Sequence, residues 1–71
     1  MLEKIITVIA DVLDASPDLI TPDTHRDTCA SWDSLAHLQI IAELEDRLGV
    51  TIPFEAVSQI HCVRDFEKFI Q

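Results

Sequence analysis

The spacing of the apolar residues limits the possible folds of this chain more than any other feature. Near the start they recur every three or four positions, at Leu2, Ile5, Ile6, Ile9, Val12 and Leu13. Further along they recur at Leu35, Leu38, Ile41, Ala42, Leu44 and Leu48. This spacing places each set on one face of an α-helix, and no stretch shows the alternation typical of a strand. The sequence therefore predicts an all-α fold.

Residues that start and stop helices indicate where the two long helices end. The first helix is expected over residues 2–14, and Ser16-Pro17 should end it. Asp33 is a natural N-cap for the second helix, which should run from Asp33 or the serine after it to Leu48. Gly49 lies where a left-handed C-cap is needed. The ends of the second helix are therefore well specified.

The rest of the chain predicts two short helices and one long loop. The short helices are expected over residues 54–60 and 63–70. Residues 15–32 are rich in Asp, Thr, Ser and Pro, and loops of this length are often functional. Leu19 and Ile20 should reach the core and fix this loop. We therefore predict a four-helix bundle with a long loop between helices 1 and 2 and a short third helix.

Length and charge restrict the possible functions. With 71 residues there is room for one core, so residues 1–71 should form a single domain. Thirteen acidic and five basic residues give a formal net charge of −8, which disfavours nucleic acid and anionic lipid as partners. No apolar run approaches the roughly 18 residues of a membrane span, and no signal peptide is evident, so we expect a cytoplasmic protein. Four short elements enclose little volume, so we expect no enzyme.

The segment Ser31-Trp32-Asp33-Ser34-Leu35 is the most informative part of the sequence. Ser34 follows the capping residue at the end of the long loop, so its hydroxyl should face water. The free N–H groups and the positive end of the helix dipole favour an attached anion there, such as a phosphodiester. The alternative is that Ser34 is only a residue that suits a helix start.

The chain resembles the acyl carrier protein family, whose modified serine lies in an Asp-Ser-Leu motif at the start of the second helix. Asp33-Ser34-Leu35 matches this motif. Other segments are similar to the family in the same order: Ile20-Thr21-Pro22-Asp23-Thr24, the helix positions Leu38, Ile41 and Leu44-Glu45, Leu48-Gly49-Val50-Thr51-Ile52-Pro53, and Val63-Arg64-Asp65-Phe66. The resemblance covers nearly the whole chain and implies an acyl-carrier-like helical bundle.

The resemblance also implies a function and a cofactor. Ser34 would carry 4′-phosphopantetheine, attached covalently from coenzyme A by a separate phosphopantetheinyl transferase that recognises Asp33. The thiol of this arm would hold acyl intermediates as thioesters for acyl- or aminoacyl-loading enzymes and for condensing or transfer enzymes. We expect a monomer without catalytic residues of its own. Two alternatives stay open, an aminoacyl or peptidyl carrier protein and an unmodified helical adaptor.

The residues around the serine depart from the commonest fatty-acid carriers. Ser31-Trp32 stands where Gly-Ala often precedes the aspartate, and Ala36 and Gln39 stand where acidic residues often follow. With His37 after the motif, the segment is more similar to carriers of polyketide, peptide or surface-saccharide pathways. We expect the partner-binding surface to comprise Leu35, Ala36, His37, Gln39, Glu43 and Asp46.

Two aromatic residues near the motif have simpler interpretations than catalysis. Trp32 is expected to pack the end of the loop against the bundle, or else to line the arm or contact a partner. His37 lies one turn after Ser34, but a hydrolase would also need an orienting acid and an oxyanion hole. We therefore expect His37 to be solvated or to face a partner.

The cysteines and histidines do not predict a metal site. Cys29 and Cys62 form no Cys-x-x-Cys motif, and we expect both to be free thiols. Their spacing with the three histidines matches no zinc ribbon or finger, the histidines being His25, His37 and His61.

Overall fold

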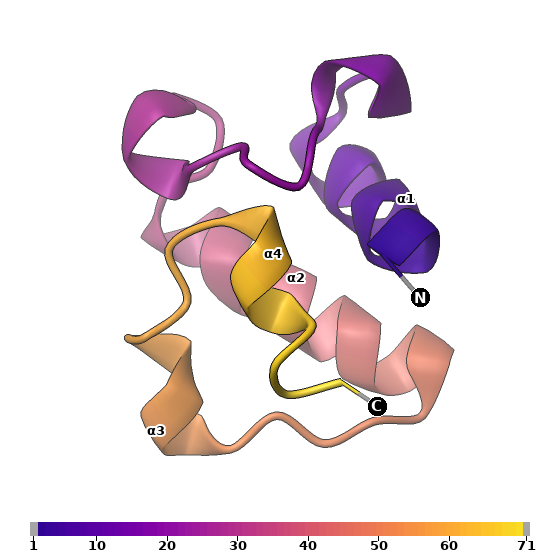
Figure 1. Ribbon diagram of the computed structural model, residues 1–71, viewed down its shortest axis with the longest axis vertical. Coiled ribbons are helices and arrows are strands. Elements are labelled where there is room, and N and C mark those ends of the chain that lie inside the picture. The colour runs from indigo at the N-terminus through magenta and orange to yellow at the C-terminus, as the bar shows by residue number, and fades with distance from the viewer. Residues whose placement is uncertain (1, 71) are drawn as a thin grey trace.

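The computed structural model describes residues 2–70, which fold into helices joined by turns (Figure 1). The helices are α1 (Leu2–Leu13), α2 (Ser34–Leu48), α3 (Phe54–Val57) and α4 (Val63–Phe66). Apart from one antiparallel bridge between His25 and Cys62, no strand pairing occurs within residues 2–70. The predicted all-α class is therefore confirmed. No helix in this range has the length and hydropathy that a membrane span requires.

A single hydrophobic core joins the helices. α1 packs along α2, and α4 packs against α1. The largest fully buried side chains come from α1, α2, α4 and the link before α4, and they are Phe66, Ile5, Ile9, Ile40, Leu44, Ile60 and Val63. Each such side chain contributes on the order of 1.5–3 kcal/mol by leaving water. The short C-terminal elements are therefore held by burial rather than by their own helical hydrogen bonds.

The buried face of α2 differs from the face that the apolar spacing predicted. Leu35 and Leu38 are 66% and 53% exposed. The core-facing residues of α2 are Ala36, His37, Ile40, Ile41 and Leu44. These positions follow the helical repeat, but they include a small residue and a polar one. The prediction relied on the larger leucines instead, and the face that contains them is turned toward solvent. As a result, two leucines lie on the surface within or near the first turn of α2.

The two short helices end earlier than predicted, because the chain tightens after each of them. After α3, the Gln59 N–H bonds to the Ala56 carbonyl at 2.9 Å, and Ile60 then enters the core from a link. After α4, the amides of residues 67–69 bond to carbonyls three residues earlier, at 3.1–3.2 Å. These tighter turns still bring Ile70 into the core, where it is 3% exposed.

The connection from α1 to α2 contains two short 3-10 turns, η1 (Pro17–Leu19) and η2 (Arg26–Thr28). α1 ends before Ser16-Pro17, because Asp14 adopts a left-handed conformation with φ 55. Ser16 instead caps η1 by accepting a hydrogen bond from the Asp18 N–H at 3.3 Å. Of the two residues expected to enter the core, Ile20 is buried and Leu19 is 72% exposed. The prediction for Leu19 is wrong because η1 turns this side chain toward solvent.

Backbone hydrogen bonds fasten this connection to the start of α4. The Arg26 N–H donates to the His61 carbonyl at 2.8 Å, and the Val63 N–H donates to the Thr24 carbonyl at 3.1 Å. A third bond runs from the Arg64 N–H to the Pro22 carbonyl at 2.9 Å. Figure 1 shows the connection passing from the end of α1 to the start of α2. These bonds give the loop a defined path, and that path ends at the start of α2.

Candidate functional site

Ser34 is the first residue of α2, and its side chain is exposed. The carboxylate of Asp33 caps the helix, since its Oδ1 accepts a hydrogen bond from the Ala36 N–H at 2.8 Å. The first N–H groups of a helix have no acceptor within the helix, and here the amides of Ser34 and Leu35 are two of them. The hydroxyl of Ser34 therefore lies at the positive end of α2. The predicted cap is confirmed, as is the left-handed C-cap at Gly49 with φ 65.

A hydrogen-bonded pair of aromatic residues holds the backbone on both sides of Ser34. The Trp32 indole Nε1–H donates to His37 Nδ1 at 3.0 Å, and His37 Nε2 lies 2.8 Å from the Val57 carbonyl oxygen. An indole nitrogen only donates and a carbonyl only accepts. Both bonds are therefore satisfied by the neutral imidazole with its hydrogen on Nε2. This bridge joins the loop end, α2 and α3.

Burial keeps this imidazole neutral. Loss of contact with water lowers the pKa of His37 below its ordinary value of 6.5, and the charges of Arg26 and His61 lower the pKa further. The hydrogen bond to Val57 acts in the opposite direction and raises the pKa.

The Trp32 ring also stacks on Phe66, with ring centroids 6.2 Å apart and the planes at 10°. Trp32 thus packs the loop end against α4, as predicted.

Two residues expected on the partner-binding surface lie in the core instead. His37 is 3% exposed and Ala36 is 8% exposed. The expectation that His37 is solvated or faces a partner is wrong, because its ring fills the space between Trp32, Phe66 and α3. A catalytic pair of Ser34 with His37 is also excluded, since both ring nitrogens bond elsewhere. The sequence did contain one sign of this buried pair, because Trp32 and His37 are five residues apart on either side of the helix start.

The remaining residues of that expected surface differ in how free they are to meet a partner. Leu35, Gln39 and Asp46 are exposed. Glu43 is partly exposed and accepts a hydrogen bond from Arg47 Nε at 2.8 Å, while Arg47 also bonds to Asp11 on α1 at 2.6 Å. Arg47 shares its single positive charge between two carboxylates, so the negative charge of Glu43 is only partly offset within the protein.

Beside Ser34 lies a shallow depression of about 330 Å³, lined by Arg26, Asp27, Trp32, Asp33 and Ser34. The depression combines the Ser34 hydroxyl with two acidic residues and one basic residue, so an anion there would depend on the positive charge of Arg26. Nothing in the sequence marks Arg26 as a site residue except that it is a base in an acidic loop. Only the path of the loop brings it beside Ser34.

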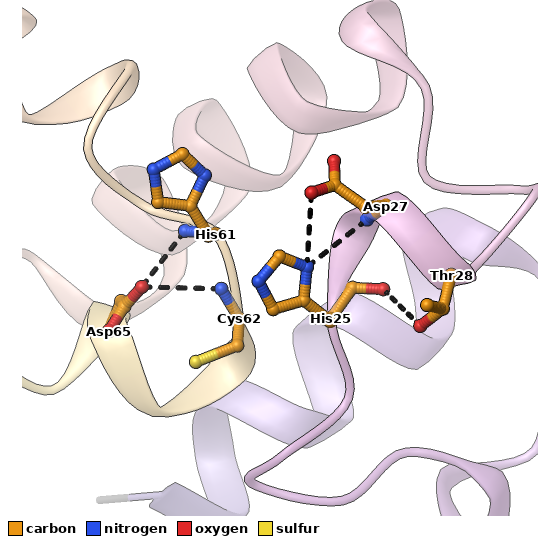
Figure 2. A network of polar contacts seen from close by, with 6 residues as sticks. All are labelled: His25, Asp27, Thr28, His61, Cys62 and Asp65. Atoms are coloured by element: carbon orange, nitrogen blue, oxygen red, sulfur yellow. Dashed lines mark hydrogen bonds and ion pairs between the residues drawn. The ribbon is translucent and has the colours of Figure 1, made fainter.

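The other two histidines, His25 and His61, lie close to Cys62 where the loop meets the start of α4 (Figure 2). The rings of His25 and His61 stack with centroids 6.0 Å apart. Cys29 and Cys62 are partly buried free thiols. Within residues 2–70, no three His, Cys, Asp or Glu side chains are grouped so that they could hold a metal ion.

Matches to known proteins extend over nearly the whole chain, as a family and one relative illustrate. Residues 3–70 match the protein family described as "Phosphopantetheine attachment site". An acyl carrier protein from Thermosynechococcus vestitus (strain NIES-2133 / IAM M-273 / BP-1) is 33% identical to this chain over 70 residues, which cover 99% of the chain and 86% of the relative. Both matches include the loop, the start of α2 and the short C-terminal helices.

Proposed function

Since this chain belongs to the phosphopantetheine-binding acyl carrier protein family, we propose that Ser34 is the residue that bears its covalently attached 4′-phosphopantetheine. Members of this family are carriers rather than catalysts, and we propose that residues 1–71 act as one carrier domain without an activity of its own. The observation that supports Ser34 most directly is its exposed hydroxyl at the start of α2, within the sequence Asp33-Ser34-Leu35.

The surroundings of Ser34 fit the chemistry of attachment. The hydroxyl oxygen forms a bond to the phosphorus that carries pantetheine in coenzyme A, the hydroxyl proton leaves, and adenosine 3′,5′-bisphosphate departs. The resulting phosphodiester is an anion at the positive end of α2, and the helix dipole stabilises a charge there by about 0.3–1 kcal/mol. Asp33 does not compete for the free amides of the first two helical residues, because its Oδ1 bonds to Ala36.

The attached arm supplies a thiol that holds the cargo as a thioester. We propose that the cargo is an acyl intermediate, with an aminoacyl or peptidyl group as the alternative. The family carries a covalent arm, which leaves no support for the unmodified adaptor. The protein contributes position, because Trp32 and His37 fix the backbone on either side of Ser34. It also contributes recognition by the transferase and by the loading, condensing or transfer enzymes.

A polyketide, peptide or surface-saccharide pathway is the proposed setting. Ala36 no longer supports this proposal, because it is buried and cannot define a partner surface. What supports it is the exposed Gln39, in a place where fatty-acid carriers often have an acid, together with Trp32 before the motif. The proposed partner surface therefore reduces to Leu35, Gln39, Glu43 and Asp46.

Intact-mass measurement tests the attachment residue. The unmodified protein is incubated with coenzyme A and a broad-specificity phosphopantetheinyl transferase. Wild type should gain the mass of one phosphopantetheine, and Ser34→Ala should gain nothing while keeping its helical circular dichroism. Ser31→Ala is a matched control, because Ser31 is also exposed and lies only three residues earlier, and it should be loaded like wild type. Loading of Ser34→Ala would overturn the assignment.

A further inference from the structure

We propose that the guanidinium of Arg26 binds the phosphodiester at the base of the arm and so restricts how the arm leaves the protein surface. This proposal rests on attachment at Ser34. It concerns a positioning residue, since Arg26 would contact the link between the arm and the protein rather than the cargo.

The first observation is that Arg26 lacks an acidic partner in a strongly acidic protein. Three other bases pair with carboxylates: Arg47 with Asp11 and Glu43, Arg64 with Asp23 at 3.0 Å, and Lys68 with Asp65 at 3.3 Å. Among residues 2–70 no carboxylate lies within ion-pairing distance of the Arg26 side chain, although Arg26 is partly buried. An arginine can bury its aliphatic stem while its guanidinium stays in water, so this head group is available to an anion that is held nearby.

The second observation is where this charge lies. Arg26 lines the same depression as Ser34, and its charge reaches the interior closely enough to lower the pKa of His37. Asp27 and Asp33 also line the depression. Asp33 caps α2 through Ala36. The exposed Asp27 carboxylate lies 3.5 Å from His25 Nδ1, but that nitrogen accepts the Asp27 N–H and so offers the carboxylate no hydrogen. Arg26 is the base in a depression that already contains two carboxylates, so an added phosphodiester would be repelled there without it.

The third observation is that the backbone around Arg26 is firmly held. Its own N–H bonds to the His61 carbonyl at 2.8 Å, and the neighbouring His25 pairs with Cys62 across an antiparallel bridge. Figure 2 shows the two sides of this junction, where the Asp65 carboxylate accepts hydrogen bonds from the amides of His61 and Cys62 at 2.9 and 3.3 Å. The guanidinium therefore extends from a defined position, and less conformational entropy is lost when it meets an anion.

These three observations together predict a salt-sensitive contact. A guanidinium can donate two parallel hydrogen bonds to the free oxygens of a phosphodiester, which makes the pair directional. The covalent link keeps the two groups at a high effective concentration, so even a weak pair is populated. Because the depression is open to water, raising salt to about 1 M, where the screening length is about 3 Å, should weaken it.

Phosphorus and nitrogen NMR on the loaded protein test the contact without any enzyme assay. On conversion of the unmodified to the loaded wild type, the Arg26 Nε–H signal should shift and exchange with water more slowly. The ³¹P signal of the phosphodiester should shift and sharpen in Arg26→Gln, and Arg26→Lys should lie between that variant and wild type. Arg64→Gln removes an equal charge elsewhere and should leave the ³¹P signal as in wild type. Circular dichroism checks that each variant is folded.

The outcomes separate this proposal from the one on which it rests. If intact mass shows no loading, or Ser34→Ala is still loaded, attachment at Ser34 fails and the role of Arg26 fails with it. If Ser34 is loaded but the Arg26 Nε–H signal of wild type is unchanged and the ³¹P signal is the same in Arg26→Gln, only the role of Arg26 is overturned. The comparison of unmodified and loaded wild type needs no substitution, so a variant that fails to fold does not prevent a decision.

Discussion

At the scale of single residues, the His37 side chain is buried and held at both of its ring nitrogens. Its Nδ1 accepts from Trp32 at 3.0 Å, and its Nε2 donates to the Val57 carbonyl at 2.8 Å. Protonation of Nδ1 would set two donors against each other, because the indole nitrogen cannot accept. A charged imidazole would therefore lose the hydrogen bond from Trp32 that joins the loop end to α2, while its Nε2–H would still donate to Val57 in α3.

We expect the free energy of unfolding to decrease as the pH falls from about 7 to about 5. Folding lowers the pKa of His37 below 6.5, so the unfolded chain takes up this proton at a higher pH than the folded chain. The stabilisation is therefore fully present above about 6.5 and is lost as the pH falls toward the folded pKa. The charges of Arg26 and His61 also lower the pKa of His37 and increase the effect. Urea unfolding across this range should give a flatter profile for His37→Gln, which accepts and donates but does not titrate.

A second titrating residue provides an internal control for that experiment. The hydrogen bond from the His61 N–H lowers the pKa of Asp65 below 3.8, with Lys68 and the Cys62 N–H adding to the effect. The contribution of Asp65 is thus present above about 4 and lost below it. Acid unfolding in that lower range should persist in His37→Gln. If the slope between about pH 7 and 5 were the same in wild type and His37→Gln, His37 would not be the group that controls it.

At the scale of elements, α2 is fixed most clearly by its two ends. Asp33 caps the start through Ala36, and Gly49 takes the left-handed conformation at the end. Both residues could be identified from the sequence because capping depends on local geometry, which few residue types satisfy. The side of α2 that faces the core could not be identified from the sequence, because the buried face includes Ala36 and His37 while two leucines remain exposed.

Replacement of Asp33 should separate its structural role from its proposed recognition role. Asp33→Ala removes the cap and should lower the free energy of unfolding by about 1 kcal/mol, whereas Asp33→Asn should keep most of it, since asparagine caps equally well. If the transferase recognises the charge, both variants should load more slowly than wild type. Thermal unfolding and the time course of intact mass measure the two effects. Equal melting temperatures for wild type and Asp33→Ala would contradict the capping role.

The lengths of α3 and α4 depend on tertiary structure. Apolar residues at helical spacing continue beyond Val57 and Phe66, so the sequence predicted longer helices. In the structure the chain tightens instead, and Ile60 and Ile70 are buried from non-helical segments. For segments this short, propensity is a weak constraint and burial decides the conformation.

At the scale of the whole molecule, the long loop and the start of α4 form one unit although they are distant in sequence. Backbone groups make the connection, from Arg26, Val63 and Arg64 to the carbonyls of His61, Thr24 and Pro22. Every residue has a backbone carbonyl and every residue except proline has an N–H, so the sequence contains no sign of which groups pair. The position of Ser34 was predictable from capping and from the family motif, whereas the place of Arg26 beside it required the fold.

The distribution of charge on the surface decides which partners this carrier would suit. Of the proposed partner surface, Leu35 and Gln39 are exposed near the start of α2 and carry no charge. Glu43, one turn further along, pairs with Arg47, which also pairs with Asp11, so the charge of Glu43 is only partly offset. Asp46, near the end of the helix, is exposed. Enzymes that bind acidic residues on the first turns of α2, after the proposed attachment site, would therefore find few negative charges there.

Gln39→Glu should consequently increase the rate at which a fatty-acid ketosynthase or malonyl transferase accepts the loaded protein, by up to about tenfold at low salt. Added salt should reduce the gain, because the new charge is exposed and screened. Thr7→Glu is the matched control, since it adds the same charge on the exposed face of α1, and it should leave the rate unchanged. Ala36→Asp should fail for a different reason, as it places a carboxylate at a position that is 8% exposed and should lower the melting temperature. Equally high rates for wild type and Gln39→Glu would show that this position does not exclude fatty-acid enzymes, and the proposed pathway class would lose its main support.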